Sequence, residues 1–335
     1  MNNKKSKINS ILITILMVII LIVVVKDDYK QILQILTKMN LIFILLAILS
    51  YSMYVILYGY LGYITINQKD KVSLLTSIKL YLINLFFSGI TPFAYGGEPM
   101  QIYYLTKYDV KLEDATNAVI IDYILYQISL LLIGIFALIY NSLFHVYDIT
   151  LEIKYALILG YAVNIIGILA LSGSIFAKNT MQKIITNIIV FLSKIKLIKN
   201  KKERLEKTNK QIDDFYLSSR TMINRKGFIK KALFINILSL SFRHLTAAFI
   251  IYASGIYKLN PLQAFTASAL TFVCAAFIPI PGGSGGTEYF FVKFISKYML
   301  EPFAKVILLS WRLITYYLPM IIGLILTKTG GKKWE

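Results

Sequence analysis

Long apolar runs alternate with short polar segments along the chain. Runs nearly free of charged residues occupy 8–25, 41–66, 114–141, 153–177, 231–256 and 302–327. A helix of about 20 apolar residues crosses the hydrocarbon core of a bilayer, because each residue adds about 1.5 Å. The pattern therefore predicts an all-α integral membrane protein with about six full transmembrane helices.

Two further apolar segments, 72–103 and 261–300, are interrupted by proline and glycine. The interruptions contain Pro92, Gly96, Gly97 and Pro99 in the first segment, and Pro279, Pro281, Gly282, Gly283, Gly285 and Gly286 in the second. Proline lacks the backbone N–H and glycine favours turns, so a continuous helix is not expected. Irregular backbone is not tolerated against lipid. We therefore predict two re-entrant hairpins whose tips are buried in protein or face a water-filled cavity.

The two interrupted segments also suggest an internal repeat. An offset of 189 residues places Pro92 on Pro281, Gly96-Gly97 on Gly285-Gly286 and Gly134 on Gly323. Glu98 and Glu288 differ by 190 positions, as do Asp122 and Arg312. We interpret residues 1–335 as one membrane domain with inverted halves at about 41–141 and 231–327, as in transporters whose sites lie at the midplane. Chance matching of glycines and prolines is the alternative.

Composition and charge narrow the class of protein. Of the 335 residues, 57% are hydrophobic and 16% charged, well below the roughly 25% charged residues of soluble domains. A soluble enzyme and a disordered chain are excluded. The single cysteine, Cys274, rules out a disulfide within the chain, and two histidines make a Cys/His metal site unlikely to form.

The distribution of the net charge of +19 predicts an orientation. Segment 178–231 carries 15 Lys and Arg against 4 Asp and Glu, whereas 142–152 carries no Lys or Arg. Because cytoplasmic loops are enriched in Lys and Arg, we expect a multi-pass protein of the cytoplasmic membrane with both termini in the cytoplasm. The first apolar run is interpreted as a retained anchor. Residues 178–230 are expected to form an interfacial amphipathic helix, to about 198, followed by a basic loop.

Five charged residues in or near the apolar segments are candidates for binding substrate, because charges within a membrane are costly and usually functional. They are Glu98, Asp122, Arg243, Glu288 and Arg312. Each glutamate follows Gly-Gly at a predicted helix start, where it either caps the helix or binds a cationic headgroup or a proton. Asp122 and Arg312 either form an ion pair between the halves, or Arg312 binds a lipid phosphate.

Other residues give weaker signals. His244, beside Arg243, is expected to be a packing residue. Tyr104, with Tyr103, follows the first hairpin tip and joins the substrate-binding candidates. The sequence has no phosphate-binding loop, serine nucleophile motif or zinc motif. We therefore expect no catalytic residue, no cofactor and no metal.

Two motifs resemble a known family. They are Gly96-Gly97-Glu98-Pro99 followed by Tyr103-Tyr104-Leu105, and Pro279–Glu288 followed by Trp311-Arg312. They are similar to the membrane domain of the lysylphosphatidylglycerol synthase/flippase family. The resemblance implies that this domain translocates aminoacylated phosphatidylglycerol. In full-length members a C-terminal soluble domain transfers lysine from lysyl-tRNA to the lipid, which gives resistance to cationic antimicrobial peptides. We expect this chain to correspond to the flippase-like domain without the synthase domain.

The leading hypothesis is therefore a lipid translocase for an anionic or aminoacylated phospholipid. One alternative is a phosphatidylglycerol lysyltransferase, alone or with a separate synthase subunit. Another is a scaffold that recruits a cytoplasmic partner through 199–230. Binding of tRNA is not expected, because some 30 polar residues cannot form a catalytic domain. Assembly into a homo-oligomer is also compatible with the sequence.

Overall fold

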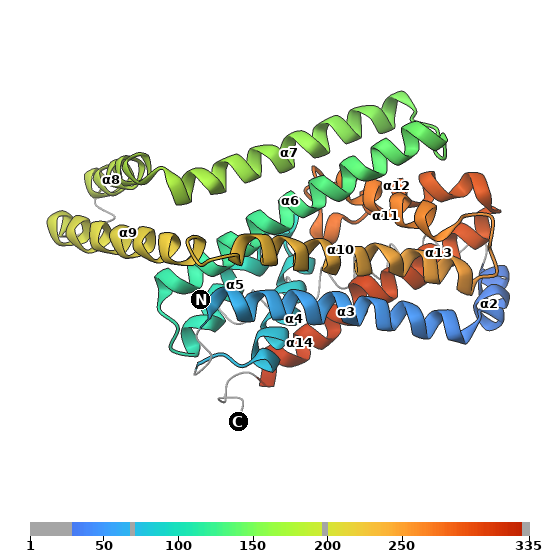
Figure 1. The fold of residues 1–335 in the computed structure, drawn as a ribbon, viewed down its shortest axis with the longest axis horizontal. Coiled ribbons are helices and arrows are strands. Elements are labelled where there is room, and N and C mark those ends of the chain that lie inside the picture. The colour runs from blue at the N-terminus through green and yellow to red at the C-terminus, as the bar shows by residue number, and fades with distance from the viewer. Residues whose placement is uncertain (1–28, 68–70, 196–199, 330–335) are drawn as a thin grey trace.

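A computed structural model describes residues 29–67, 71–195 and 200–329, and this part of the chain is helical without strands. Five helical segments are long and apolar enough to cross a membrane: α3 Leu41–Ile66, α6 Leu112–Phe144, α7 Leu151–Phe176, α10 Phe228–Ala253 and the α13–α14 segment Glu301–Lys328. They run along the long axis of the molecule (Figure 1). The prediction of an all-α membrane protein is confirmed. The predicted span 8–25 lies outside the described residues.

Both interrupted segments form broken helical hairpins. The first consists of α4 Leu74–Ile90, the 3-10 turn η1 Pro92–Ala94 and α5 Gly97–Lys107. The second consists of α11 Pro261–Ala275, η2 Pro281–Gly283 and α12 Gly286–Ile295. They enter the bundle from opposite ends, the second from the end that carries α2 Tyr29–Lys38 (Figure 1). The turns η1 and η2 contact each other, so the two tips meet inside the protein.

The two hairpin tips share one backbone conformation. In the first, Phe93 and Ala94 have φ of 55° and 59°, and in the second Gly282 and Gly283 have φ of 64° and 61°. These pairs correspond under the same 189-residue offset that aligns Pro92 with Pro281. Glycine adopts a left-handed conformation freely, whereas other residues pay about 1 kcal/mol or more. The first tip therefore holds strained backbone that the second tip avoids.

Polar caps fix the starts of several helices at the bundle ends. The Asn40 side chain accepts a hydrogen bond from the Ile42 N–H of α3, and Thr150 caps α7 in the same way. Asn260 and Gln263 form a capping box at the start of α11. Each cap satisfies an N–H that the helix leaves unpaired. The polar residues that interrupt the apolar runs thus define where each helix begins.

The α7–α11 contact depends on a glycine, which leads to a prediction about stability. A Cβ on Gly160 would lie 1.9 Å from the Val273 carbonyl oxygen, whereas a Cβ on Gly167 of the same helix has no atom within 4 Å. We expect Gly160→Ala to lower the stability by about 1–3 kcal/mol, because the two helices must separate. Gly167→Ala should leave stability unchanged or slightly higher. Thermal unfolding of both purified variants in detergent tests this, and equal midpoints would contradict it.

The last membrane segment is not the uninterrupted helix that 302–327 predicted. It consists of α13 Glu301–Arg312, a π-helical turn Leu313–Tyr317 and α14 Leu318–Thr329. Pro319 has no N–H to donate to the carbonyl one turn earlier, and a wider turn accommodates the missing bond. The turn follows directly after Arg312, and π-helical turns are frequent at functional sites.

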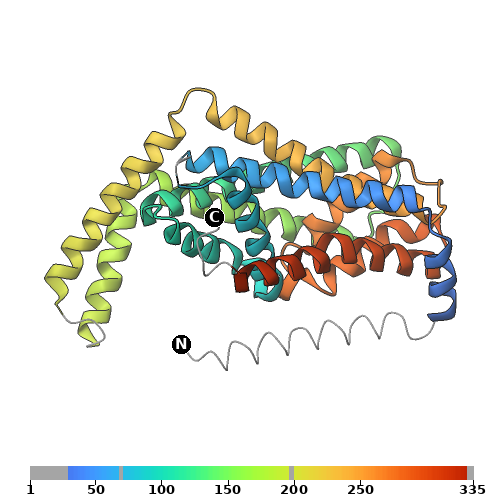
Figure 2. The same ribbon diagram turned by 90° about the horizontal axis from the view of Figure 1, so that it is seen from below.

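Residues 178–230 contain a helix where the amphipathic helix was predicted, but a second helix in place of the predicted basic loop. They contain two helices, α8 Lys178–Lys194 and α9 Lys201–Ile223, which pack side by side and project from the bundle (Figure 2). Residues 201–223 are rich in good helix formers, with Glu-to-Lys spacings of four at Glu203 and Lys207. One face of α9 is buried through Ile212, Tyr216, Ser219 and Met222. Burial of this face stabilises a helix where a loop was predicted.

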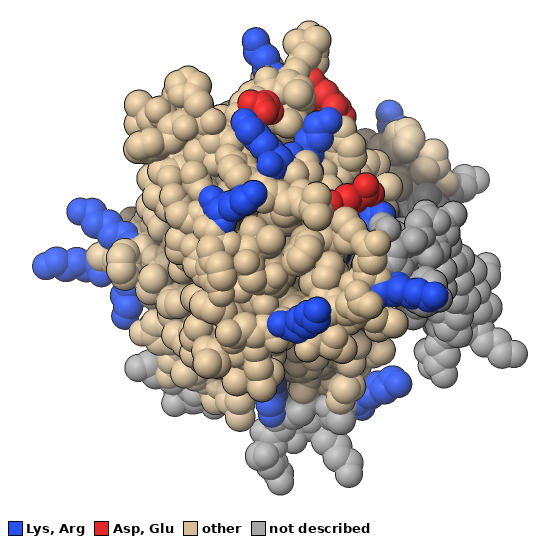
Figure 3. Space-filling model, turned by 90° about the vertical axis from the view of Figure 1, so that its right-hand side faces the viewer, with Lys and Arg blue, Asp and Glu red and all other residues tan. Residues whose placement is uncertain are grey.

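The two ends of the bundle differ in charge density. One end carries the basic α8–α9 pair. Figure 3 views the other end, where Lys and Arg side chains are accompanied by Asp and Glu, as in the Lys293–Glu152 and Lys297–Asp148 pairs. The excess of Lys and Arg over Asp and Glu in 178–231 therefore lies at the end from which α4 and α5 enter.

Candidate functional site

A cavity of about 250 Å³ lies between the two hairpin tips. Its walls come from both hairpins and from α3, α6, α7, α10 and the π-helical turn. Among the lining residues are Phe93, Ala94 and Tyr95 of the first tip and Gly282 and Gly283 of the second. The volume is slightly below the roughly 300–1,000 Å³ of pockets for drug-sized ligands. It suits a small polar group rather than a large ligand.

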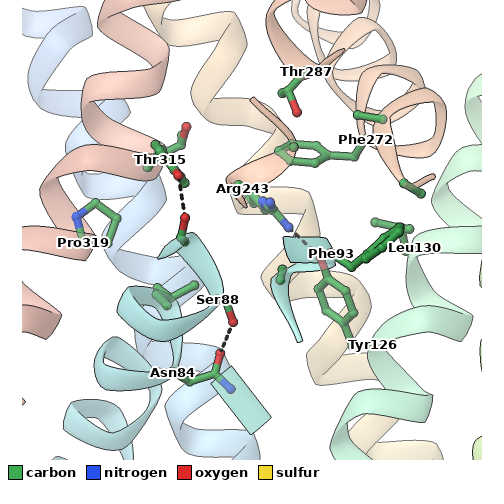
Figure 4. A pocket seen from close by; sticks show the side chains of 18 of the residues that line it. Asn84, Ser88, Phe93, Tyr126, Leu130, Arg243, Phe272, Thr287, Thr315 and Pro319 are labelled. Atoms are coloured by element: carbon green, nitrogen blue, oxygen red, sulfur yellow. Dashed lines mark hydrogen bonds between the residues drawn. The ribbon is translucent and has the colours of Figure 1, made fainter. Parts of the chain in front are cut away.

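Arg243 of α10 reaches this cavity, as its sequence position suggested. Its Nη1 donates a hydrogen bond of 2.7 Å to the Tyr126 hydroxyl, and its guanidinium lies 3.8 Å from the centre of the Phe272 ring (Figure 4). Its Nε is buried and has no hydrogen-bond partner among the described residues. No carboxylate of these residues lies within 4.0 Å of it. Arg243 thus keeps a positive charge and an unused donor at the cavity.

A cluster of tyrosines surrounds Arg243, which the sequence analysis missed. Tyr51, Tyr54 and Tyr58 of α3 line the cavity with Tyr81 of α4. The Tyr58 and Tyr81 rings stack with centres 4.1 Å apart, and the Tyr54 and Tyr81 hydroxyls are hydrogen-bonded. The spacing of three and four residues on α3 places these rings on one helix face. That spacing was the available signal.

Arg312 pairs with Glu288 within the second half. Its Nε lies 2.7 Å from Glu288 Oε1, and its Nη2 donates to the Gly282 carbonyl at 3.2 Å. Glu288 also accepts a 2.7 Å hydrogen bond from the Gly285 N–H and so caps α12. The alternative of an Asp122–Arg312 ion pair is therefore wrong. Arg312 lines the cavity with its charge balanced by Glu288 behind it.

Glu98 lies in the first turn of α5 and lines the same cavity. Its carboxylate interacts with the Asn84 side chain. Asn84 in turn donates to Gln101 at 3.1 Å and accepts from Ser88 at 3.2 Å, on the opposite wall from Arg243 (Figure 4). Within the described residues no Lys or Arg nitrogen lies within 4.0 Å of Glu98. Unlike Glu288, it is an unbalanced carboxylate.

Three predicted substrate-binding residues, Asp122, Tyr104 and Glu288, do not line the cavity. Glu288 pairs with Arg312 and caps α12. Asp122 is 4% exposed and accepts a 2.6 Å hydrogen bond from the Thr65 hydroxyl of α3. Tyr104 is buried in the apolar cluster around α5 and α6. Asp122 contacts α3 while its neighbours Tyr123 and Tyr126 line the cavity, so helix face rather than position along the helix decides. His244 is buried, contacts Ser268 at 3.0 Å and packs on Phe265, as expected of a packing residue.

Most of the predicted tip residues shape the hairpins rather than the cavity surface. Gly282 and Gly283 line the cavity, whereas Pro92, Gly96, Gly97, Pro99, Pro279, Pro281, Gly285 and Gly286 do not. A Cβ on Gly97 would lie 2.1 Å from Ser88 Oγ, and one on Gly286 1.8 Å from Ile278 Cδ1. Glycine at these two positions lets the second helix of each hairpin start against the first.

The cavity is lined by Arg243, Arg312 and Glu98, and because Arg312 pairs with Glu288, one cation and one anion are left unpaired. It is lined mainly by aromatic rings and amides, and no group of three or more His, Cys, Asp or Glu that could hold a metal occurs in the described residues. Such a lining can hold a ligand that carries both charges, because buried charges need partners of opposite sign.

Comparison with known proteins identifies the family. The family model described as "Lysylphosphatidylglycerol synthase TM region" matches residues 9–323. Comparisons with curated proteins and with solved structures found no match. The family match supports a membrane role in lysylphosphatidylglycerol synthesis or translocation. The chain belongs to the lysylphosphatidylglycerol synthase membrane-region family.

Proposed function

We propose that this protein translocates a phospholipid whose headgroup carries both a phosphate and an ammonium group, such as aminoacylated phosphatidylglycerol. One observation carries the proposal: Glu98 and Arg243 line a single cavity between broken helices, and neither has an ion-pair partner among the described residues. The headgroup enters the cavity while the acyl chains stay in the bilayer. The exposed side chains of Phe93 and Tyr95 mark the cavity mouth at the first tip.

The two unbalanced charges explain the choice of headgroup. Arg243 has donors for a phosphate oxygen, because a guanidinium presents a fork of N–H groups. Glu98 accepts hydrogen bonds from an ammonium group. Arg312 is already neutralised by Glu288 at 2.7 Å, so it supports the second tip and contributes less charge. A headgroup with only a phosphate would leave Glu98 buried and unpaired, which is costly.

The arrangement of the hairpins supports alternating access. We interpret residues 41–141 and 231–327 as inverted repeats, because their tips share a backbone conformation at one offset and enter from opposite ends. Broken helices at a repeat interface are typical binding sites of such transporters. We place the α8–α9 end and both termini in the cytoplasm, where Lys and Arg accumulate. The basic α8–α9 pair then attracts anionic lipid to the entrance.

The headgroup assignment predicts a change in selectivity. Wild type should bind lysylphosphatidylglycerol more tightly than phosphatidylglycerol, and Glu98→Gln should reduce that preference by about tenfold, the value of one hydrogen bond to a charged group. Native mass spectrometry of the detergent-purified protein with each lipid measures both affinities. Glu206→Gln on α9, which is exposed, is the matched control. Unchanged selectivity in Glu98→Gln would overturn the assignment of Glu98.

The synthase alternative is tested separately. Lipid extracts of cells that express the protein would contain new aminoacylated phosphatidylglycerol if the chain itself formed it. The proposal predicts no such lipid without a separate synthase. Its appearance in cells that lack other synthases would favour the transferase alternative.

A further inference from the structure

Asp122 is a buried carboxylate that does not line the cavity between the hairpin tips, which we call the lipid cavity. It is 4% exposed in the middle of α6, and no Lys or Arg nitrogen of the described residues lies within 4.0 Å of it. The titratable groups that face it electrostatically are Tyr58 of α3 and Arg225 of the α9–α10 turn. Charged carboxylates inside membrane spans are costly and are typical of proton pathways.

The contact between Asp122 and Thr65 accommodates both charge states. Thr65 Oγ1 lies 2.6 Å from Asp122 Oδ1 and 2.9 Å from the Leu61 carbonyl oxygen. A hydroxyl has one hydrogen to donate. When Asp122 is ionised, Thr65 donates to it. When Asp122 is protonated, its O–H donates to Thr65, and Thr65 donates to Leu61. The proton can therefore be taken up or released while the heavy atoms stay in place.

Asp122 is connected to the bundle end that carries α8 and α9. Thr65 lines a second cavity of about 410 Å³, together with the exposed residues Lys111 and Asp214. Arg225 lines it too, and donates hydrogen bonds to the Ile64 and Thr65 carbonyls at 2.9 and 2.8 Å. Arg225 thus fixes the end of α3 beside the carboxylate. Thr65, whose hydroxyl contacts Asp122, thus belongs to the wall of this cavity.

Polar groups also lead from Asp122 toward the lipid cavity. Gly62 has no side chain, and a Cβ there would have Ser77 Oγ at 2.9 Å, Asp122 Oδ2 at 3.7 Å and Gln101 Nε2 at 4.0 Å. Three polar groups match the number of hydrogen-bond partners that a buried water molecule typically has. Gln101 accepts a 3.1 Å hydrogen bond from Asn84, which lines the lipid cavity beside Glu98. The polar groups between the two cavities are therefore nearly continuous.

We propose that Asp122 is a proton-binding site between the second cavity, which Thr65 and Arg225 line, and the lipid cavity. Lipid translocation is then coupled to proton movement through Asp122. This inference rests on the proposed function. In the step, a hydronium ion gives a proton to Asp122 Oδ1: its O–H bond breaks and leaves water, and a new O–H bond forms on the carboxylate while the Thr65 hydrogen turns to Leu61. The reverse reaction, in which Asp122 gives the proton to a water molecule beside Gly62, releases it toward the lipid cavity. No redox partner is needed.

The experiment uses proteoliposomes that hold the full chain, headgroup-labelled lysylphosphatidylglycerol and an imposed pH gradient. With one proton moved per lipid, a gradient of about one pH unit should shift the ratio of lipid between leaflets about tenfold in wild type. Asp122→Asn keeps the shape and the hydrogen bond but cannot release a proton, so its ratio should not respond to the gradient. Asp148→Asn, at an exposed site of the opposite end, should behave as wild type.

The outcomes separate this inference from the proposed function. Wild type that moves lipid with no response to the gradient would overturn the proton site and leave translocation standing. If wild type moves no lipid, the proposed function fails, and infrared titration of the purified protein then decides on the proton site. The carbonyl band of a protonated carboxylic acid should appear and disappear with pH in wild type and be missing in Asp122→Asn. A spectrum identical in both proteins would overturn the proposal.

In the proteoliposome experiment, Thr65→Ser should retain the coupling of lipid movement to the pH gradient, and Thr65→Val should weaken it.

Discussion

Replacing Arg243 by leucine is expected to reduce lipid translocation about 100-fold. Arg243 is the unbalanced cation of the cavity, and its loss removes the phosphate's charged partner, which corresponds to about 2–3 kcal/mol for a desolvated charge pair. Leucine keeps the apolar contact with Phe272, whose ring centre lies 3.8 Å from the guanidinium. Translocation by the purified variant in proteoliposomes measures the effect.

Two further variants make the Arg243 result interpretable. Arg243→Lys keeps the charge but loses the planar fork that reaches Tyr126 at 2.7 Å, so it should retain part of the activity. Lys258→Leu changes an exposed cation between α10 and α11, away from the α8–α9 pair, and should leave the rate close to that of wild type. Wild-type rates in Arg243→Leu would show that the headgroup does not use this cation.

The second large effect concerns stability. Arg312→Met should lower the free energy of unfolding by about 3 kcal/mol, because removing one partner of a buried ion pair leaves an uncompensated charge. The Arg312 side chain is 5% exposed and the Glu288 side chain is 15% exposed. The double variant Arg312→Met with Glu288→Gln should recover much of this loss. Chemical unfolding in detergent measures both, and a double variant less stable than the single one would contradict the account.

The hairpins could be predicted from sequence because their signal is local. Prolines and paired glycines clustered at one point of an apolar segment disfavour a continuous helix there. The structure places the breaks at Pro92–Ala94 and Pro281–Gly283, within the predicted interruptions. The left-handed Phe93 and Ala94 could not be predicted, since neither residue prefers that conformation. Strain of this kind is held by surrounding contacts and often marks functional sites.

The partners of the charges could not be predicted, because they depend on long-range packing. An ion pair between Asp122 and Arg312, at equivalent positions of the two halves, would neutralise two charges within the membrane, yet Arg312 contacts Glu288 and Asp122 contacts Thr65. The offset describes equivalent positions in two halves, and equivalent positions need not touch. The tyrosines of α3 were overlooked for a different reason. Tyrosine is common at membrane interfaces, so only their shared face distinguished them.

Translocation by the wild-type protein tests the central claim most directly. Vesicles with headgroup-labelled lysylphosphatidylglycerol are treated with an impermeant quencher, with and without the protein, and with Arg243→Leu in parallel. The account predicts that label from the inner leaflet becomes accessible in wild-type vesicles, and that Arg243→Leu vesicles resemble those without protein. Equal quenching in all three, with the protein folded and inserted, would contradict a translocation pathway through the cavity between the hairpin tips.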